Sequence, residues 1–303
     1  MREPCGILIV NKPIGMTSHD VVGRVRRLFG TRRVGHTGTL DPLAEGVLVV
    51  LIGRAAKAAE YLVCDQKSYR ATMRLGLTSD TEDVTGILVA SENPLPSQDQ
   101  VFATCREFVG EIAQIPPMYS ALKVNGQKLY DLARRGITVE RQARPVTIHA
   151  LTATPTDTPA DYLLDVICSA GTYIRTLCAD IGASLGCGAV MASLQRTAAG
   201  GFSLDEAHTL EELEAMNEGD RLACLLPTES LFVTLPACPM PVFYERLFRS
   251  GCEIYQKKIG THFEIGTRVR VCSADGKFLA LGEVREYEDG TAIKSIKLFD
   301  LET

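Results

Sequence analysis

A carboxylate stands in a loop that is rich in glycine and proline and that directly precedes an apolar run. Asp41 is followed by Pro42, has glycines on both sides at 38 and 46, and comes before residues 47–52, a run typical of a buried strand. We expect this loop at a sheet edge, where Asp41 can be aimed at a substrate as a nucleophile or proton-transfer group. On the residues alone, an ordinary Asp-Pro turn explains the pattern more often.

Three further residues could do chemistry, although each has a plain structural explanation when considered alone. Tyr69 lies in the alternating segment 68–75, which predicts a strand in which tyrosine usually packs. Arg175 lies in a predicted helix over 172–185, and most arginines are surface groups. His36 precedes Asp41 by five residues, but a lone histidine is more often structural or exposed.

The charge distribution favours a nucleic-acid partner more than the total does. The 303 residues carry a formal net charge of −5, yet residues 1–80 hold twelve Lys/Arg against seven Asp/Glu, and residues 106–145 hold seven against four. A locally basic face can attract phosphate on an acidic protein. On charge alone, ordinary solvated side chains remain the simpler explanation.

Composition indicates a cytoplasmic protein without a metal site. No apolar run reaches the ~18 residues of a membrane span, and the N-terminus lacks the layout of a signal peptide. The ten cysteines contain no Cys-x-x-Cys pair, and the nearest two, Cys178 and Cys187, are nine apart. We therefore expect reduced thiols in a reducing compartment, no metal, and no nucleotide cofactor, since no phosphate-binding glycine motif is present.

The hydrophobic pattern predicts alternating strands and helices. A first helix has Ser18 as its N-cap and Gly30 as its terminator, and capping boxes begin at Ser97 and Thr209. Strands are predicted over 6–10, 47–52, 68–75, 146–153, 162–168, 278–284 and 293–299. Further helices are predicted over 54–62, 97–109, 127–135, 172–185 and 209–216.

Two segments differ from the rest of the chain in amino-acid composition and predicted secondary structure. Residues 119–145 are basic and polar, which is typical of an inserted arm. Beyond about residue 235, short strands with Asp-Gly turns at 275–276 and 289–290 predict a small β module. The acidic stretch 78–86 is predicted to be a polar turn.

Five segments, in order, closely resemble the bacterial TruB family of synthases that make pseudouridine in the T arm of tRNA. They occupy residues 11–18, 35–50, 67–70, 117–123 and 169–177, within a stretch from 8 to about 202. The resemblance implies an α/β (α+β) fold, with a mixed, largely antiparallel central sheet flanked by helices. It also implies a catalytic domain over 1–234, with its RNA-binding arm at about 119–145, and a PUA-like RNA-binding β domain over 235–303.

The same resemblance assigns the catalytic residues. Asp41 matches the family's catalytic aspartate, and Arg175 matches the arginine expected to hold it ionised through a bidentate contact. Tyr69 matches the tyrosine that stacks on the target base and is available for proton transfer at C5. Tyr173 and Leu194 match residues that line the base pocket.

RNA binding is expected from further positions. The target uridine must be flipped out of the T loop, and His36 matches the residue that stabilises the opened loop. Phosphate contacts, which position RNA without reading its sequence, are expected from Arg32, Arg33, Lys123, Lys128, Arg134 and Arg135. Loop shape should supply much of the specificity.

Three residues depart from the family's usual pattern. Thr39 replaces Ala or Gly, Ser68 stands where an aromatic residue or threonine is common, and Glu45 adds a carboxylate four residues from Asp41. If Glu45 faced the site it would raise the pKa of Asp41. We expect Glu45 to point to solvent instead.

Three functions follow as expectations. The first is a monomeric, stand-alone, metal-free and cofactor-free synthase that converts uridine 55 in the T stem-loop of tRNA. The second is the related guide-dependent box H/ACA synthase, against which the basic arm argues. The third is a mainly RNA-binding or tRNA-folding protein, in which catalysis is secondary.

Overall fold

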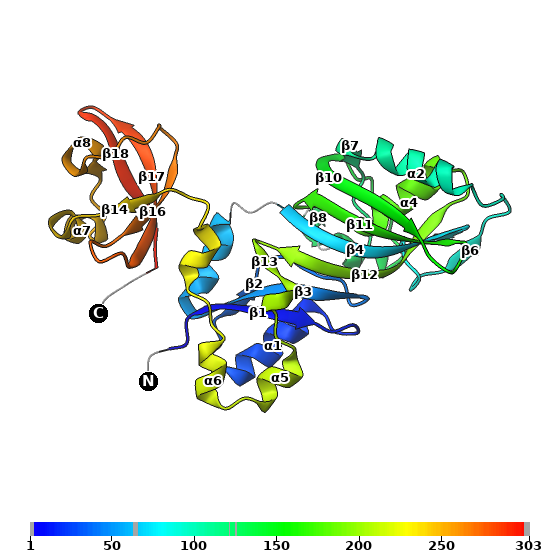
Figure 1. The fold of residues 1–303 in the computed structure, drawn as a ribbon, viewed down its shortest axis with the longest axis horizontal. Helices are drawn as coiled ribbons and strands as arrows, with labels where there is room; N and C mark the ends of the chain where they lie inside the picture. Colours follow the sequence, from blue (N-terminus) through cyan, green and yellow to red (C-terminus); the bar gives the residue numbers. More distant parts are fainter. Residues whose placement is uncertain (1–2, 63–65, 121, 125, 300–303) are drawn as a thin grey trace.

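The computed structural model describes residues 3–62, 66–120, 122–124 and 126–299, and across them the largest element is a nine-stranded sheet (Figure 1). Its strands are β1 (Gly6–Lys12), β2 (Val34–His36), β3 (Ala44–Ile52), β4 (Gln66–Leu75), β7 (Gly110–Gln114), β10 (Arg144–Pro155), β11 (Asp161–Ser169), β12 (Ala189–Ala199) and β13 (Phe202–Ser203). Their order is β1-β3-β12-β4-β11-β10-β7, with β2 paired to β3 and β13 to β12.

This sheet is mixed and largely antiparallel, as the family resemblance implied. Among the strand pairs of this sheet that the structure describes, only β3–β12 is parallel, with Ala44 opposite Leu194 and Gly46 opposite Arg196. The parallel junction joins the N-terminal strands to those of the following segment. It brings the start of β3, and with it the Asp41 loop, beside β12.

Helices cover the sheet. They are α1 (Ser18–Leu28), α2 (Gln98–Glu107), α4 (Ile174–Ser184), α5 (Leu210–Ala215) and α6 (Glu218–Ala223), with 3-10 turns η1 (Gly53–Tyr61), η2 (Leu204–Glu206) and η3 (Thr228–Phe232). Along β1 and β3, alternate residues enter different cores because successive side chains point to opposite faces. Leu8 and Val50 pack with α1 and α5, whereas Ile9 and Val49 pack with η1 and η3.

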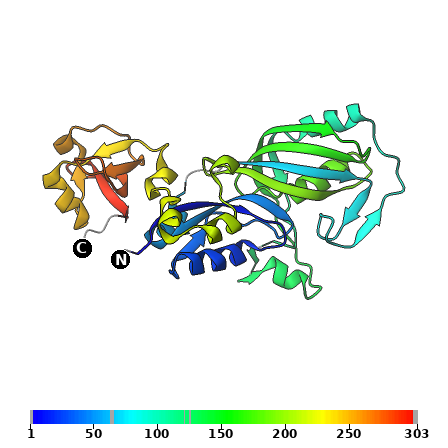
Figure 2. The ribbon, with the colours of Figure 1, turned by 60° about the horizontal axis from the view of Figure 1, so that its bottom comes forward.

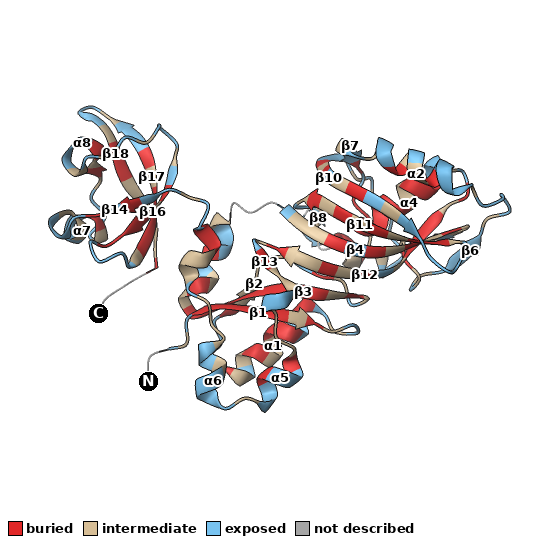
Figure 3. Cartoon of the chain, in the orientation of Figure 1, coloured by how far each residue is buried: buried red, intermediate tan, exposed pale blue. Residues whose placement is uncertain are grey.

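The other half of the sheet carries α2 and α4 on one face (Figure 3). Apolar side chains of β4, β10, β11 and β12 pack there against Leu177 and Ile181 of α4 and Val101 of α2. Phe102 and Tyr162 add an edge-to-face contact, with ring centroids 6.4 Å apart. This core holds α4 rigidly against the sheet, and α4 carries Arg175.

Two short hairpins extend from this body. The pair β5 (Leu77–Ser79) and β6 (Leu88–Ala90) encloses the acidic turn. The pair β8 (Lys123–Val124) and β9 (Gln127–Lys128), followed by α3 (Leu129–Ala133), lies in the predicted arm. Figure 2 shows the α3 segment projecting away from the central sheet.

A second sheet follows the linker turn η3. It contains β14 (Ala237–Pro239), β15 (Ile254–Tyr255), β16 (Arg268–Cys272), β17 (Phe278–Tyr287) and β18 (Gly290–Leu298), with α7 (Val242–Arg249) and α8 (Gln256–Ile259) beside them. Its strand order is β14-β16-β17-β18-β15. Phe232 of η3 contacts Phe278 and Phe299, each at 5.9 Å between centroids, so an aromatic cluster joins the linker to this sheet.

Local sequence signals are confirmed where they act over a few residues. The capping boxes at Ser97 and Thr209 are present, and turns at 275–276 and 289–290 connect β16 to β17 and β17 to β18. The first helix is capped by Thr17, so the prediction of Ser18 is wrong by one residue. The helix predicted over 54–62 is the 3-10 helix η1 (Gly53–Tyr61) rather than an α-helix. The helix predicted over 127–135 shrinks to α3 because Gln127 and Lys128 pair with β8.

Among the residues that the structure describes, nine cysteines are free thiols; Cys64 lies outside them. Over the same residues, no helix has the length and apolar character to cross a bilayer. No group of three or more His, Cys, Asp or Glu side chains there is arranged to hold a metal ion.

Candidate active site

The loop that carries Asp41 is fastened on both sides. Ala44 N–H donates to the carbonyl of Asp41 over 3.0 Å, which closes a turn directly before β3. On the other side, the buried Ser18 hydroxyl accepts from Leu40 N–H at 2.8 Å and donates to Leu40 C=O at 3.1 Å. Ser18, which the sequence suggested as a helix cap, therefore fixes the residue next to Asp41.

A buried arginine on β12 binds the backbone of the same loop. Arg196 of β12 is 1% exposed. Its Nε donates to Val47 C=O at 2.7 Å, Nη2 to Gly38 C=O at 3.1 Å, and Nη1 to Thr39 C=O at 3.4 Å. One guanidinium thus ties the start of β3 to the loop before Asp41, because its planar fork can reach several acceptors at once.

Lys12 fastens the N-terminal segment beside this loop. Its ammonium is fully buried and donates to the carbonyls of Pro13 at 2.9 Å and Met16 at 2.7 Å. Burial lowers the pKa of Lys12 to about 8, and the negative charge of Asp41 opposes that fall. Lys12 is therefore close enough to Asp41 for their charges to interact.

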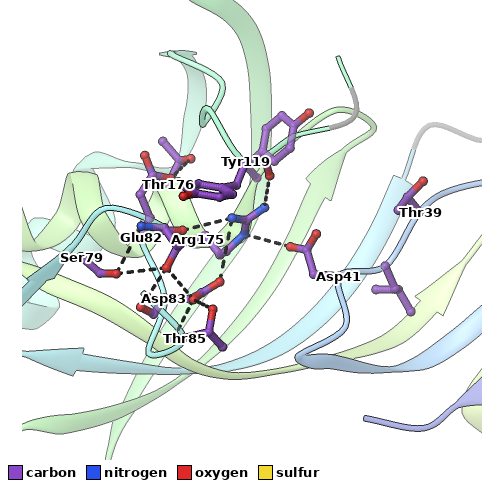
Figure 4. Close-up of polar contacts among 12 residues, drawn as sticks. Thr39, Asp41, Ser79, Glu82, Asp83, Thr85, Tyr119, Arg175 and Thr176 are labelled. Carbon is purple, nitrogen blue, oxygen red and sulfur yellow. Dashed lines mark hydrogen bonds and ion pairs between the residues drawn. The ribbon is translucent and has the colours of Figure 1, made fainter. Parts of the chain in front are cut away.

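Arg175 meets Asp41 at the centre of the site (Figure 4). Its Nε lies 2.9 Å from Asp41 Oδ2, its Nη1 donates to Thr81 C=O at 3.0 Å, and its Nη2 donates to Tyr119 C=O at 2.9 Å. The expectation of a bidentate contact, which followed from the family resemblance, is wrong, because both terminal nitrogens bind carbonyls. The side chain of Arg175 is 5% exposed and that of Asp41 36% exposed, so the guanidinium is fixed while the carboxylate stays open to a substrate.

The acidic turn between β5 and β6 holds the far side of Arg175. Asp83 Oδ2 lies 3.9 Å from Arg175 Nη1. Its other oxygen, Oδ1, accepts from the Thr81 hydroxyl at 2.8 Å and from Thr85 N–H at 2.9 Å (Figure 4). Glu82 adopts a left-handed conformation, with φ +63°, and accepts a hydrogen bond from the Thr176 hydroxyl of α4. A turn that looked like ordinary polar surface in the sequence thus presents a second carboxylate to the arginine.

The electrostatics of Asp41 reflect opposing causes. Burial raises the pKa of the Asp41 carboxyl above its ordinary value, and the charge of Asp83 adds to the rise. The ion pair with Arg175 and the charge of Lys12 lower it. A desolvated carboxylate held by one strong partner is a better base and nucleophile than a solvated one.

Tyr69, Tyr173 and Leu194 lie on elements that adjoin the Asp41 loop or carry Arg175. Tyr69 of β4 is 7% exposed and lies opposite Arg196 in the strand register, and Leu194 lies in the same core cluster. Burial raises the pKa of both Tyr69 and Tyr173, and both phenols lie within range of the Asp41 charge. Both are therefore neutral hydroxyl groups near the carboxylate.

His36 ends β2 on the way into the loop. Its Nδ1 accepts from Gly38 N–H at 3.3 Å. Burial and the charge of Arg196 lower the pKa of the imidazole. A neutral, half-buried ring therefore stands at the start of the Asp41 loop, where it can stack but carries no charge at pH 7.

The expected phosphate contacts are distributed over two separate regions. Arg32 and Arg33 precede β2 and are exposed, and Arg33 pairs with Glu3 at 3.1 Å. Lys123, Lys128, Arg134 and Arg135 belong to the arm. Within the arm, Lys128 Nζ and Arg134 Cζ lie 5.3 and 5.4 Å from the centroid of the Tyr130 ring.

One further expectation from the sequence is wrong. Glu45 does not point freely to solvent: it is half-buried, and its Oε1 accepts from Gln195 Nε2 of β12 at 3.0 Å. The structure also adds Lys12, Asp83 and Arg196, which sequence reasoning missed. The alternation of Thr81, Asp83 and Thr85 was the one local signal for Asp83, while nothing local distinguishes Arg196 from an ordinary strand residue.

Two family models together match most of the chain. The family model of the TruB family pseudouridylate synthase N-terminal domain matches residues 26–174. The model of the tRNA pseudouridylate synthase B C-terminal domain matches residues 175–233.

Curated relatives agree with these matches. A tRNA pseudouridine synthase B of Alkaliphilus oremlandii is 42% identical over 298 residues, which cover 98% of each chain. One of Syntrophotalea carbinolica is 50% identical over 238 residues, covering 77% of this chain and 78% of the relative. One of Burkholderia mallei is 41% identical over 93% of each chain.

Solved structures share the whole architecture at lower identity. A Cbf5-Nop10-Gar1 complex contains a chain that superposes with a TM-score of 0.75 at 27% identity, covering 97% of this chain and 85% of that chain. An archaeal box H/ACA sRNP Nop10-Cbf5 complex gives 0.73 at 26% identity, covering 98% and 87%.

Proposed function

The chain belongs to the TruB family of pseudouridylate synthases and is a tRNA pseudouridine synthase, and we propose that it converts uridine 55 in the T loop. The observation that carries the proposal is the ion pair between Asp41, which is open to a substrate, and the buried Arg175. This oriented carboxylate supports the role of catalytic aspartate that the family resemblance implies for Asp41. The family membership and the site geometry therefore support the same chemistry.

The reaction needs one carboxylate and no change in oxidation state. The N1–C1′ bond of uridine breaks, the base turns, and a bond forms from C5 to C1′, after which the C5 proton leaves and N1 gains one. Asp41 acts either as a nucleophile or as the proton-transfer and electrostatic group. Because no net hydrolysis or redox step occurs, we propose that the enzyme works without a metal or cofactor.

The surrounding residues support Asp41 in distinct ways. Burial raises the pKa of the Asp41 carboxyl, and the positive charge of Arg175 lowers it again. Arg175 therefore helps to keep Asp41 ionised. Tyr69 stacks on the flipped base and, as a neutral phenol, is available for proton transfer at C5. Tyr173 and Leu194 line the pocket in which the base turns.

Base flipping must precede these steps, since the target uridine is stacked within its loop. His36, a neutral ring in the loop that leads to Asp41, takes the place of the extruded base or stacks beside it. Arg32, Arg33, Lys123, Lys128 and Arg134 bind phosphates of the T stem-loop. Such contacts orient the RNA, and the shape of the loop then selects the uridine.

The proposed organisation assigns residues 1–234 to the catalytic domain, with the arm at about 119–145, and residues 235–303 to a PUA-like RNA-binding domain. The second sheet and its aromatic contact with the linker support this division. We further propose that the enzyme is a monomer that acts in the cytoplasm.

A guide-dependent box H/ACA synthase is the weaker alternative. The relatives at 41–50% identity are named tRNA pseudouridine synthase B, whereas the Cbf5 chains share the fold at 26–27% identity. The stand-alone function predicts activity on RNA without guide or partner proteins.

The test uses purified protein and an unmodified T-arm hairpin without guide RNA or added metal. Pseudouridine is read by carbodiimide-labelled primer extension, because the product has the mass of the substrate. We expect modification at the single loop uridine, its loss in Asp41→Asn, and no change in Asp165→Asn, which alters only an exposed pair with Arg70.

Two results would count against the proposal. Tight binding without modification, repeated with full-length tRNA, would favour a guide-dependent enzyme or a tRNA-folding protein. Modification that persists in Asp41→Asn would remove Asp41 from its proposed role.

A further inference from the structure

A buried glutamine holds the backbone of Tyr173. Gln114, the last residue of β7, is 2% exposed. Its Nε2 donates to Tyr173 C=O at 3.0 Å, and its Oε1 accepts from Tyr173 N–H at 2.8 Å. One side-chain amide thus satisfies both backbone groups of one residue, as a neighbouring strand would.

Tyr173 is the residue at which α4 starts. It is the N-cap, with extended φ and ψ of −98° and 110°, and its side chain makes no cap hydrogen bond. Its carbonyl also accepts Leu177 N–H at 3.0 Å, the first bond of the helix. The Gln114 amide therefore sets the place and direction in which the first turn begins.

Arg175 lies in that first turn, two residues after Tyr173. A side chain that must reach Asp41 Oδ2, Thr81 C=O and Tyr119 C=O together tolerates little displacement of its own backbone. Misplacement of a catalytic group by about 1 Å can cost on the order of 100-fold in rate.

We propose that Gln114 is a positioning residue for the isomerisation: its amide fixes Tyr173 and thereby holds Arg175 against Asp41. This inference rests on the proposed function of the Asp41 site. Gln114 touches neither Asp41 nor Arg175 among its described hydrogen bonds, so it acts through α4.

The arm begins in the same segment. Tyr119, five residues after Gln114, gives its carbonyl to Arg175, and Pro116 gives its carbonyl to Arg141 Nη1 at 3.0 Å. The strand end that fixes the start of α4 is therefore continuous with the root of the RNA-binding arm. By binding Tyr173, Gln114 also fixes the start of α4 relative to the first residues of the arm.

The chain supplies a matched control in its second sheet. Gln256 is 4% exposed, its Nε2 donates to Phe263 C=O at 3.0 Å, and its Oε1 accepts from Phe263 N–H at 2.7 Å. It makes the same pair of backbone contacts as Gln114 but lies in a different core from Asp41. Its amide also donates to the Thr291 hydroxyl at 2.9 Å and accepts from the Thr261 hydroxyl at 3.5 Å, so its loss removes at least as many hydrogen bonds as the loss of the Gln114 amide.

The experiment compares Gln114→Met with Gln256→Met in the full chain, because methionine keeps the length of glutamine and lacks its donor and acceptor. With the T-arm hairpin we expect kcat of Gln114→Met to fall about 10-fold with KM within twofold. Gln256→Met should lose at least as much thermal stability as Gln114→Met, and yet it should keep the kcat of the wild type.

The pH profile separates positioning from general weakening of the fold. The charged or titratable groups around Asp41 are Arg175, Asp83, Lys12, Tyr69 and Tyr173. Of these, the Gln114 amide holds Tyr173 directly and Arg175 through the first turn of α4, and Tyr173 is a neutral phenol that does not change charge in the acid limb. If Arg175 is held less firmly against Asp41, it lowers the pKa of the Asp41 carboxyl less. The acid limb of kcat should therefore move to higher pH in Gln114→Met and not in Gln256→Met.

A kcat and acid limb unchanged from the wild type in Gln114→Met would overturn the proposal, as would an equal kcat loss in Gln256→Met. If Gln114→Met does not fold, Gln114→Glu replaces it, because the carboxylate still accepts from Tyr173 N–H. We expect kcat to fall in Gln114→Glu, by less than 10-fold, and an unchanged kcat again contradicts the proposal. Failure of the wild type on tRNA would instead reject the function itself.

Discussion

Gly46 and Arg196 face each other across the parallel pair of β3 and β12 so closely that a Cβ atom on Gly46 would lie 2.2 Å from the carbonyl oxygen of Arg196. Gly46 also has φ +106°, a conformation that side chains with a Cβ rarely adopt. The close approach lets the Arg196 side chain reach back under the Asp41 loop. The parallel junction and the active site thus depend on the same glycine.

We predict that Gly46→Ala destabilises the fold by at least about 3 kcal/mol, from backbone strain and overpacking together, and that it abolishes most activity. Gly35→Ala is the control, because its Cβ would meet no atom within 4 Å and its φ is ordinary. Urea unfolding and hairpin modification measure both effects. Equal stability of the two variants would contradict this prediction, because it would mean that β3 and β12 can move apart to accommodate the added Cβ atom.

Arg175→Lys tests the three-way contact of the guanidinium. An ammonium cannot bind Asp41, Thr81 C=O and Tyr119 C=O with one rigid fork, so we expect kcat to fall roughly 100-fold. The acid limb of kcat should move to higher pH, since the pKa of Asp41 rises as its partner weakens.

Arg70→Lys serves as the matched control for that substitution. Arg70 pairs with Asp165 at an exposed position, with its side chain 53% exposed, and such pairs contribute little. A pH profile of Arg175→Lys that coincides with that of the wild type would mean that Arg175 does not set the ionisation of Asp41.

The pKa of Lys12 predicts how stability depends on pH. Folding lowers this pKa from 10.5 to about 8, so between these values the unfolded chain binds a proton that the folded chain has lost. The free energy of unfolding contributed by this group should therefore rise with pH across that window, by up to about 3 kcal/mol. Below pH 8 the buried charge is a cost to the fold.

Urea unfolding of wild type and Lys12→Met at several values between pH 7.5 and 10.5 isolates this contribution. The comparison is needed because buried thiols such as Cys105, whose pKa is raised to about 11, act in the opposite direction over the same range. The stability difference between wild type and variant should grow in favour of wild type as pH rises. A constant difference would contradict the assigned pKa.

The arm should act on RNA affinity and not on chemistry. We predict that Lys128→Gln combined with Arg134→Gln raises Kd and reduces the slope of log affinity against log salt by about 1.5, for two lost phosphate contacts. The kcat at saturating hairpin should stay within twofold. Lys57→Gln with Arg106→Gln removes the same charge from exposed positions outside the arm and should leave the slope unchanged.

Much of this protein follows from residues a few positions apart. The capping boxes at Ser97 and Thr209 and the Asp-Gly turns are complete within four residues, so they form whatever the rest of the chain does. The apolar run 47–52 likewise becomes β3 because burial on both faces leaves little alternative. The sequence pattern around Asp41 also carries the family resemblance, and with it the expected chemistry.

The supporting residues were decided only by the tertiary structure. Arg196, Asp83 and Gln114 have no local pattern that marks them, because each acts on a backbone or side chain that lies far away in the sequence. Ser18 carried a local signal for a helix cap, yet its hydroxyl binds Leu40 instead. Local sequence determines which elements form, whereas the pairing of β3 with β12 and the packing of α4 determine which distant groups meet, since only those contacts bring Asp41 and Arg175 within 2.9 Å.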